Sequence, residues 1–150
     1  MLKGLSPLLT PDLLALLAEA GHGDVVAVVD GNFPAHSRGV PVVELPGADV
    51  TQALAAICQL LPVDHRFQPY PVKHMLTADG TEGIAVEPVR ELLCDIEGTP
   101  VGLEGLERSA FYEAAGRAYA VVHTSDERPY ACFLVAKGVV QRDGRADRRV

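Results

Sequence analysis

The run of five apolar residues from 25 to 29 (VVAVV) is the feature that most constrains how this chain can fold. It is continuous and rich in valine, which is typical of a strand buried on both faces of a sheet. Polar residues crowd both of its ends, as GHGD at 21–24 and DGNFPAHS at 30–37. In open parallel sheets, the loops after the carboxyl ends of the strands form the usual ligand crevice. The side chains expected there are Asp30, Asn32 and His36, joined by His22 if the preceding loop folds back.

The rest of the chain alternates helical and strand-like apolar periodicity, which predicts an α/β domain. Residues 10–12 (TPD) provide an N-cap, a proline and an acid in the first turn of a helix, and residues 49–52 (DVTQ) resemble a capping box. Further helices are expected to begin at Glu87 and Ser109, and further strands at 40–45, 72–77, 119–123 and 131–136. Together these elements predict three layers, with a mainly parallel sheet between helices.

The length of 150 residues is that of one domain with a full hydrophobic core. We expect this domain to span residues 1–140, since no linker or internal repeat divides it. Residues 141–150 are polar and without periodicity, and are expected to be a disordered tail. Residues 63–72, rich in proline and aromatics, show no regular element and could cover a site.

Composition narrows the class of protein. A net charge of −7 argues against binding to a phosphate backbone. The apolar runs are shorter than a membrane span, and Pro7 and Pro11 come too early for a secretory leader, so the cytoplasm is the expected location. The three cysteines are odd in number and widely spaced without C-x-x-C, which predicts neither a disulfide framework nor a zinc motif.

No motif for dinucleotide binding, a P-loop or an esterase nucleophile is present. His22, Asp24, Asp30 and His36 include metal-ligand types, but without a recognised ligand spacing. The chemistry that remains is an acid/base site of histidine and carboxylate without a cofactor, because imidazole gives and takes a proton near neutral pH. The alternative is that His22 and His36 are ordinary exposed loop residues.

An ordered set of motifs resembles the family of L-fucose mutarotase and D-ribose pyranase. The set comprises LKG, SPLL, PDLL, GHGD and FPAHS in the first 37 residues, then R-x-AFYE, PYA and KGV. It extends over nearly the whole chain, to about Val140. FPAHS and R-x-AFYE are similar to the fucose branch rather than the ribose branch.

This resemblance implies an isomerase that interconverts the α and β anomers of a reducing monosaccharide, L-fucose or a related sugar. It also implies a three-layer α/β fold and ring-shaped homo-oligomers, commonly decamers, with sites at subunit boundaries and no metal or organic cofactor. The family's catalytic histidine falls on His22. Its sugar-binding residues fall on Asp30, Arg108, Tyr130, Ala131 and Cys132.

Each of these residues suits the chemistry of mutarotation. His22 would act as general acid/base, giving a proton to the ring oxygen and taking one from the anomeric hydroxyl. Asp30 would accept hydrogen bonds from sugar hydroxyls, and Arg108 would donate several. Tyr130 could donate to a hydroxyl or present its ring to the apolar face of the sugar.

Other roles stay open for several residues. Arg108 could be a surface ion-pair partner of Glu107 or Glu113, and Tyr130 could pack on the core. Asp24, Phe33 and His36 are candidates for support of the site. Phe33 could simply shape its loop, and His36 could support the site, contact sugar or lie at an interface.

Cys132 departs from the family, which has asparagine at this position. A thiol is a weak donor and acceptor where an amide offers both strongly, so sugar preference or affinity could differ. A partly exposed thiol there would also be open to oxidation. Two alternatives to a fucose-type mutarotase therefore remain: a non-catalytic sugar-binding relative and a ribose-pyranase type of ring isomerase.

Overall fold

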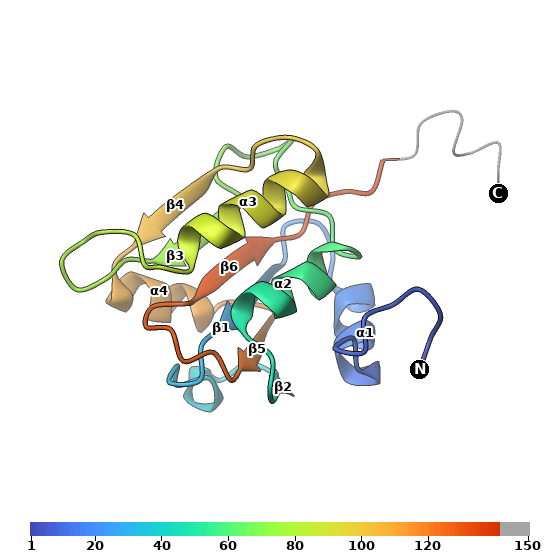
Figure 1. Ribbon diagram of the computed structural model, residues 1–150, viewed down its shortest axis with the longest axis horizontal. Helices are drawn as coiled ribbons and strands as arrows, with labels where there is room; N and C mark the ends of the chain where they lie inside the picture. Colours follow the sequence, from blue (N-terminus) through green and yellow to red (C-terminus); the bar gives the residue numbers. More distant parts are fainter. Residues whose placement is uncertain (142–150) are drawn as a thin grey trace.

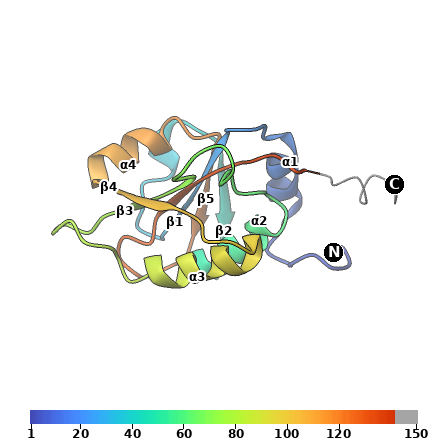
Figure 2. The ribbon, with the colours of Figure 1, turned by 90° about the horizontal axis from the view of Figure 1, so that it is seen from above.

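The computed structural model describes residues 1–141, in which one six-stranded sheet is covered by helices on both faces (Figures 1 and 2). The helices are α1 (Pro11–Glu19), α2 (Val50–Cys58), α3 (Val86–Glu97) and α4 (Arg108–Ala115), with a 3-10 turn, η1, at His36–Arg38. The strands are β1 (Val25–Val29), β2 (Val42–Leu45), β3 (Val72–Met75), β4 (Leu103–Leu106), β5 (Ala120–Thr124) and β6 (Phe133–Ala136).

The strand order is β2-β5-β1-β6-β3-β4, and only β6 runs against the other strands. The carboxyl ends of the five parallel strands therefore lie at the same side of the sheet. The antiparallel β6 begins at that side, so the residues just before β6 lie beside Asp30, which follows β1. The predicted α/β class with a mainly parallel sheet is confirmed.

The side chains of β1 pack into two separate hydrophobic cores, one on each face of the sheet. Val26 and Val28 pack into the core beneath α1, α2 and α3, whereas Ala27 and Val29 pack into the core beneath α4. All four side chains are fully buried. A strand in this position has no polar face, which explains the missing alternation.

Local sequence signals determine where helices begin on the face of the sheet that α1, α2 and α3 cover. The Thr10 hydroxyl accepts from the amide of Leu13, and Asp49 with Gln52 forms the complete capping box. At the carboxyl end of α3, Gly98 takes the left-handed conformation with a φ of 71° and ends the helix. The predicted strand at 40–45 is β2, which lies at an edge of the sheet.

Three expectations need correction. The third helix begins at Val86 rather than Glu87. The fourth helix begins at Arg108 rather than Ser109, with Glu107 as an N-cap that makes no side-chain hydrogen bond. Strand β4 was not predicted, because it is only four residues long and contains Gly105. A Cβ at Gly105 would lie 2.4 Å from a methyl carbon of Leu76, so a larger residue there would displace the Leu76 side chain.

Residues 142–150, most of the predicted tail, lie outside the described residues. Among the helices of residues 1–141, none has the length and hydrophobicity required to cross a membrane.

Candidate functional site

The GHGD turn holds His22 between the end of α1 and the start of β1. The Asp24 carboxylate accepts from the amide of Gly21 at 2.7 Å, which closes the turn, and Gly23 has a φ of 86°. Backbone hydrogen bonds of 2.8 Å join Gly23 and Asp24 to Lys137. The Lys137 ammonium donates to the Leu17 carbonyl at 2.9 Å, near the end of α1. Asp24 thus supports His22 by fixing the turn rather than by touching its ring.

The carboxylate that contacts the His22 ring is that of Asp64, which the sequence did not reveal. The distance from Nε2 of His22 to Oδ1 of Asp64 is 3.1 Å, and Gln68 donates to the other carboxylate oxygen at 2.8 Å. The Phe67 ring lies 4.9 Å from the imidazole. The His22 side chain is 46% exposed whereas that of Asp64 is 4% exposed. Because the carboxylate accepts from Nε2, Nδ1 of His22 is the nitrogen free to exchange a proton with a ligand.

The loop that carries this partner is residues 63–71, which is the segment 63–72 without a predicted element except for Val72, the first residue of β3. The amide of Asp64 donates to the carbonyl of Ala136 at 3.1 Å, and the amide of Gly138 donates to the carbonyl of Pro62 at 2.7 Å. A Cβ at Gly138 would lie only 2.9 Å from the Cα of Asp64. Lys137 therefore holds the turn that carries His22, and Gly138 leaves room for the loop that carries Asp64 to approach it.

A second group of predicted residues gathers at the carboxyl end of β1. Asp30 is 7% exposed, and its carboxylate accepts from the amide of Asn32 at 3.0 Å and from the thiol of Cys132 at 3.3 Å. Burial raises the pKa of Asp30, partly offset by the hydrogen bonds from Cys132 and Asn32. A buried carboxylate with few donors has hydrogen-bonding capacity left for a ligand.

Cys132 is 1% exposed, so the expectation of a partly exposed, oxidisable thiol is wrong. Burial, together with the nearby Asp30 carboxylate, raises the pKa of the Cys132 thiol well above its usual value. The side chain therefore stays a neutral S–H donor. It provides one donor to Asp30, which is part of what an asparagine at this position would provide.

Arg108 and Tyr130 line a cavity of about 560 Å³ at the same edge of the sheet. Arg108 is the first residue of α4, and Tyr130 has a φ of 60°, a left-handed conformation that is uncommon for a tyrosine. Tyr130 also packs partly on the core beneath α4, so both roles considered for it apply. Glu113, one of the partners considered for Arg108, pairs with Arg117 at 3.2 Å. Ala131, between Tyr130 and Cys132, is fully buried and has only its backbone to offer.

The loop after β1 places its two other candidates apart. Phe33 packs edge-on against Phe111 and Tyr112 of α4, with ring centroids 5.8 Å and 5.1 Å away, and so shapes the loop. His36 lies in η1 beside Glu44 of β2, with 2.6 Å between Nε2 and Oε1.

The structure therefore separates His22 from Asp30 within one chain. The two residues flank opposite ends of β1, and at a rise of about 3.3 Å per residue the strand alone holds them roughly 16 Å apart. The loop before β1 does not fold back, because Lys137 and Asp64 hold it at the amino end.

Comparisons with known proteins agree with this architecture. Residues 3–140 match the family described as "RbsD / FucU transport protein family". The crystal structure of Atu2016, described as a suggested sugar-binding protein, has a TM-score of 0.88 and 35% identity, covering 94% of this chain and 97% of that one. The fucose mutarotase of Streptococcus pneumoniae in complex with L-fucose has a TM-score of 0.86 and 30% identity, covering 93% of this chain and all of that one.

The RbsD protein of Bacillus subtilis, complexed with D-ribose, is similar in fold, with a TM-score of 0.74 at 22% identity over 94% of this chain and all of that one. The family match and the two closer structures extend over nearly the same residues as the six-stranded sheet and its helices. The chain therefore belongs to the RbsD / FucU family.

Proposed function

We propose that this protein is an aldose mutarotase of the fucose type, an isomerase that interconverts the α and β anomers of L-fucose or a closely related sugar. The observation that carries the proposal is the half-exposed His22 ring with the buried Asp64 carboxylate behind it. A neutral imidazole held in one tautomer by a carboxylate is equipped to move protons near neutral pH.

The second part of the proposal concerns how the site is completed. His22 of one copy would face Asp30, Arg108 and Tyr130 of another copy, because β1 keeps the two groups apart within one chain. A closed ring of identical subunits, such as a decamer, would build such a site at each boundary between neighbours. In this arrangement each copy gives its acid/base to one site and its sugar-binding residues to the next.

Mutarotation then follows from proton transfer alone. Nδ1 of His22 takes the proton of the anomeric hydroxyl as the C1–O5 bond breaks. The imidazolium then returns that proton to O5, which gives the open-chain aldehyde with a hydroxyl at C5. Rotation about the C1–C2 bond and reclosure on the other face complete the exchange. Asp30 and Arg108 hold the sugar hydroxyls during this rotation, and the Tyr130 ring covers an apolar face of the sugar.

A non-catalytic sugar-binding protein is the second candidate, and the Cys132 position favours it. The thiol leaves fewer hydrogen bonds to sugar than an amide would, which could change turnover or preference. The similarity to Atu2016 is compatible with either role. A ribose-specific ring isomerase is less favoured, because identity to the fucose mutarotase exceeds identity to RbsD, 30% against 22%.

Saturation-transfer NMR on L-fucose, D-ribose, L-rhamnose and D-galactose tests these candidates together. We expect catalysed transfer of saturation between the α and β anomer signals of L-fucose, without added metal. Binding of a sugar without such transfer would support the non-catalytic candidate. Transfer with D-ribose alone would support the ring isomerase, and no interaction with any sugar would contradict the proposal.

A further inference from the structure

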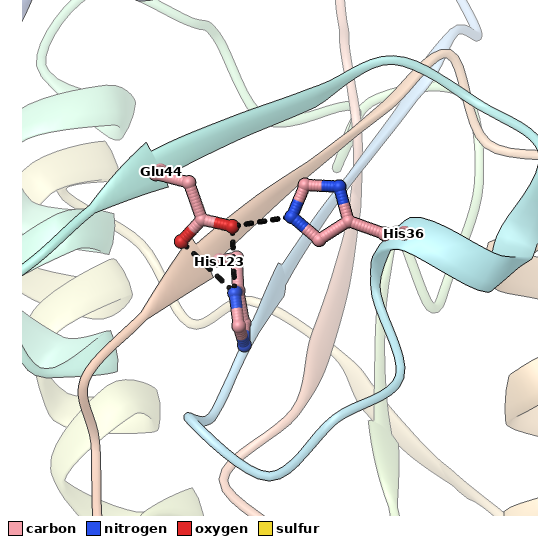
Figure 3. A group of neighbouring side chains, drawn as sticks. All are labelled: His36, Glu44 and His123. Atoms are coloured by element: carbon pink, nitrogen blue, oxygen red, sulfur yellow. Dashed lines mark hydrogen bonds and ion pairs between the residues drawn. The ribbon is translucent and has the colours of Figure 1, made fainter.

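A group of three potential metal ligands lies at the edge of the sheet, away from the atoms proposed to touch sugar. It consists of His36 from η1, Glu44 from β2 and His123 from β5 (Figure 3). Nδ1 of His123 lies 3.0 Å from each carboxylate oxygen of Glu44, and Nε2 of His36 lies 2.6 Å from one of them. One ligand atom from each residue falls within 4.8 Å of the others. We propose that His36, Glu44 and His123 bind a divalent transition-metal ion such as Zn²⁺.

The backbone supplies the two central ligands in register. Glu44 and His123 are direct neighbours across the parallel pairing of β2 with β5, so their side chains leave the same face of the sheet side by side. His36 comes from the loop after β1 and contacts the same carboxylate oxygen, Oε1 of Glu44, that His123 also contacts (Figure 3). Two ligands are therefore fixed by the sheet and the third by an exposed loop that can adjust.

The ring of His123 is oriented as in a metal ligand. Its Nε2 lies 3.3 Å from the carbonyl oxygen of Gly31, which can only accept, so Nε2 carries the hydrogen. The other ring nitrogen, Nδ1, faces both oxygens of the Glu44 carboxylate at 3.0 Å, so the imidazole and the carboxylate point at the position that a metal ion would occupy. Metal-binding histidines commonly donate their other N–H to a backbone carbonyl in this way, which fixes the tautomer.

Ligand type and exposure select the class of metal. Two imidazoles and one carboxylate suit Zn²⁺, Ni²⁺ or Cu²⁺, whereas Mg²⁺ and Ca²⁺ prefer oxygen ligands alone. His36 is 70% and Glu44 49% exposed, so an ion can enter and keep water in its remaining positions.

Binding there would fasten the loop after β1 to the edge of the sheet. Gly31, whose carbonyl accepts from His123, directly follows Asp30, and its amide donates to the carbonyl of Asp126 at 3.0 Å. An ion held by His36 and His123 would thus restrain both ends of the segment from Gly31 to His36. We expect the ion to raise the thermal stability of the protein. It would affect the proposed sugar site only through the loop after β1.

Isothermal titration calorimetry with ZnCl2 on the full chain, stripped with chelator, tests the proposal. We expect one Zn²⁺ per chain, with binding weakened at least about tenfold in each of the His36→Ala, Glu44→Gln and His123→Ala variants. The matched control is His65→Ala, because His65 pairs with Glu97 at 3.3 Å but, within residues 1–141, belongs to no group of three potential metal ligands. This control should bind Zn²⁺ like the parent.

Substitution of Co²⁺ for Zn²⁺ provides a second measurement. Absorption bands of tetrahedral Co²⁺ with nitrogen and oxygen ligands should appear in the parent and disappear in the His36→Ala/His123→Ala double variant, whose folding is checked by circular dichroism. Failure of Zn²⁺ to bind, or binding that is the same in the folded double variant, would overturn the proposal. So would a nitrogen NMR spectrum showing that His123 holds both ring protons in the presence of Zn²⁺.

Discussion

The two ends of β1 carry groups of opposite character. At the amino end, His22 is half exposed, and its carboxylate partner Asp64 is buried behind it. At the carboxyl end, the carboxylate of Asp30 is itself buried, and its partner is the neutral thiol of Cys132. The first arrangement suits proton exchange with a ligand, and the second suits accepting hydrogen bonds from one. This difference supports the proposal that His22 transfers protons while Asp30 binds the sugar.

Removal of the His22 ring should have the largest effect on the rate of anomer exchange. We expect His22→Ala to lower the rate of anomer exchange by about 10²–10⁴-fold, because the ring is the proposed acid/base. Saturation-transfer NMR measures the rate, and His65→Ala serves as a control histidine that is also paired with a carboxylate. An unchanged exchange rate in a folded His22→Ala protein would show that His22 is not the acid/base.

Co-expression of two inactive variants tests whether the two ends meet between copies. A homo-oligomer mixing His22→Ala and Asp30→Ala chains at random should regain about a quarter of the parental sites, since each site would draw one residue from each neighbour. Exchange rates of tagged mixed oligomers, compared with those of each variant alone, give the answer. Mixed oligomers no more active than the separate variants would place both residues of a site in one chain.

Loss of the Asp64 charge should have a smaller effect than loss of the ring. We expect Asp64→Asn to lower the exchange rate at least about tenfold and to shift its pH profile, because the amide no longer fixes the tautomer of His22. The apparent KM for sugar should change little, since Asp64 is buried behind the ring. A higher KM with an unchanged rate would instead assign Asp64 to sugar binding.

Cys132→Asn tests the role of the thiol beside Asp30 in sugar binding. The amide would still donate to Asp30 and would add an acceptor, so we expect L-fucose to bind more tightly by about 1 kcal/mol, roughly fivefold in Kd. Calorimetry on the parent, Cys132→Asn and Cys132→Ala should rank affinity as Asn, then Cys, then Ala. Equal or weaker binding by the Asn variant would mean that the thiol is neutral or adapted to another sugar.

The smallest expected effect is on stability. Burial raises the pKa of Asp30 in the folded protein, so the folded state is disfavoured once the pH rises through that value. Below the ordinary carboxyl pKa, Asp30 is protonated in both states and carries no such cost. Asp30→Asn should therefore gain stability relative to the parent as pH rises from 3 to 7, in urea unfolding followed by circular dichroism. A difference independent of pH would show that the Asp30 carboxylate is not destabilised by burial.

Much of the fold could be predicted because its signals are local. The continuous valine run of β1, the hydroxyl of Thr10 and the capping box at Asp49 each act within a few residues. Strand β4 escaped prediction because four residues with a glycine carry little periodicity. Its place depends on its parallel pairing with β3, which is a contact between distant segments.

Residue identities at the candidate site were also visible in the sequence, as the GHGD turn, Asp30, Arg108 and Tyr130. Their grouping was not. Asp64 lies 42 residues from His22 in a loop without periodicity, and only the approach allowed by Gly138 brings the two together. The sequence likewise gave no sign that His36, Glu44 and His123 would meet, because their spacing matches no local ligand motif.

Local patterns in the amino-acid order were thus enough to identify the buried strand, the caps of α1 and α2 and the side chains that could do chemistry. The tertiary structure decided which of those side chains are neighbours. Hydrogen bonds within a turn or a helix cap depend on the nearest residues, whereas strand order and loop approach depend on packing across the whole sheet. For that reason β1, the clearest signal in the sequence, holds His22 and Asp30 apart rather than together.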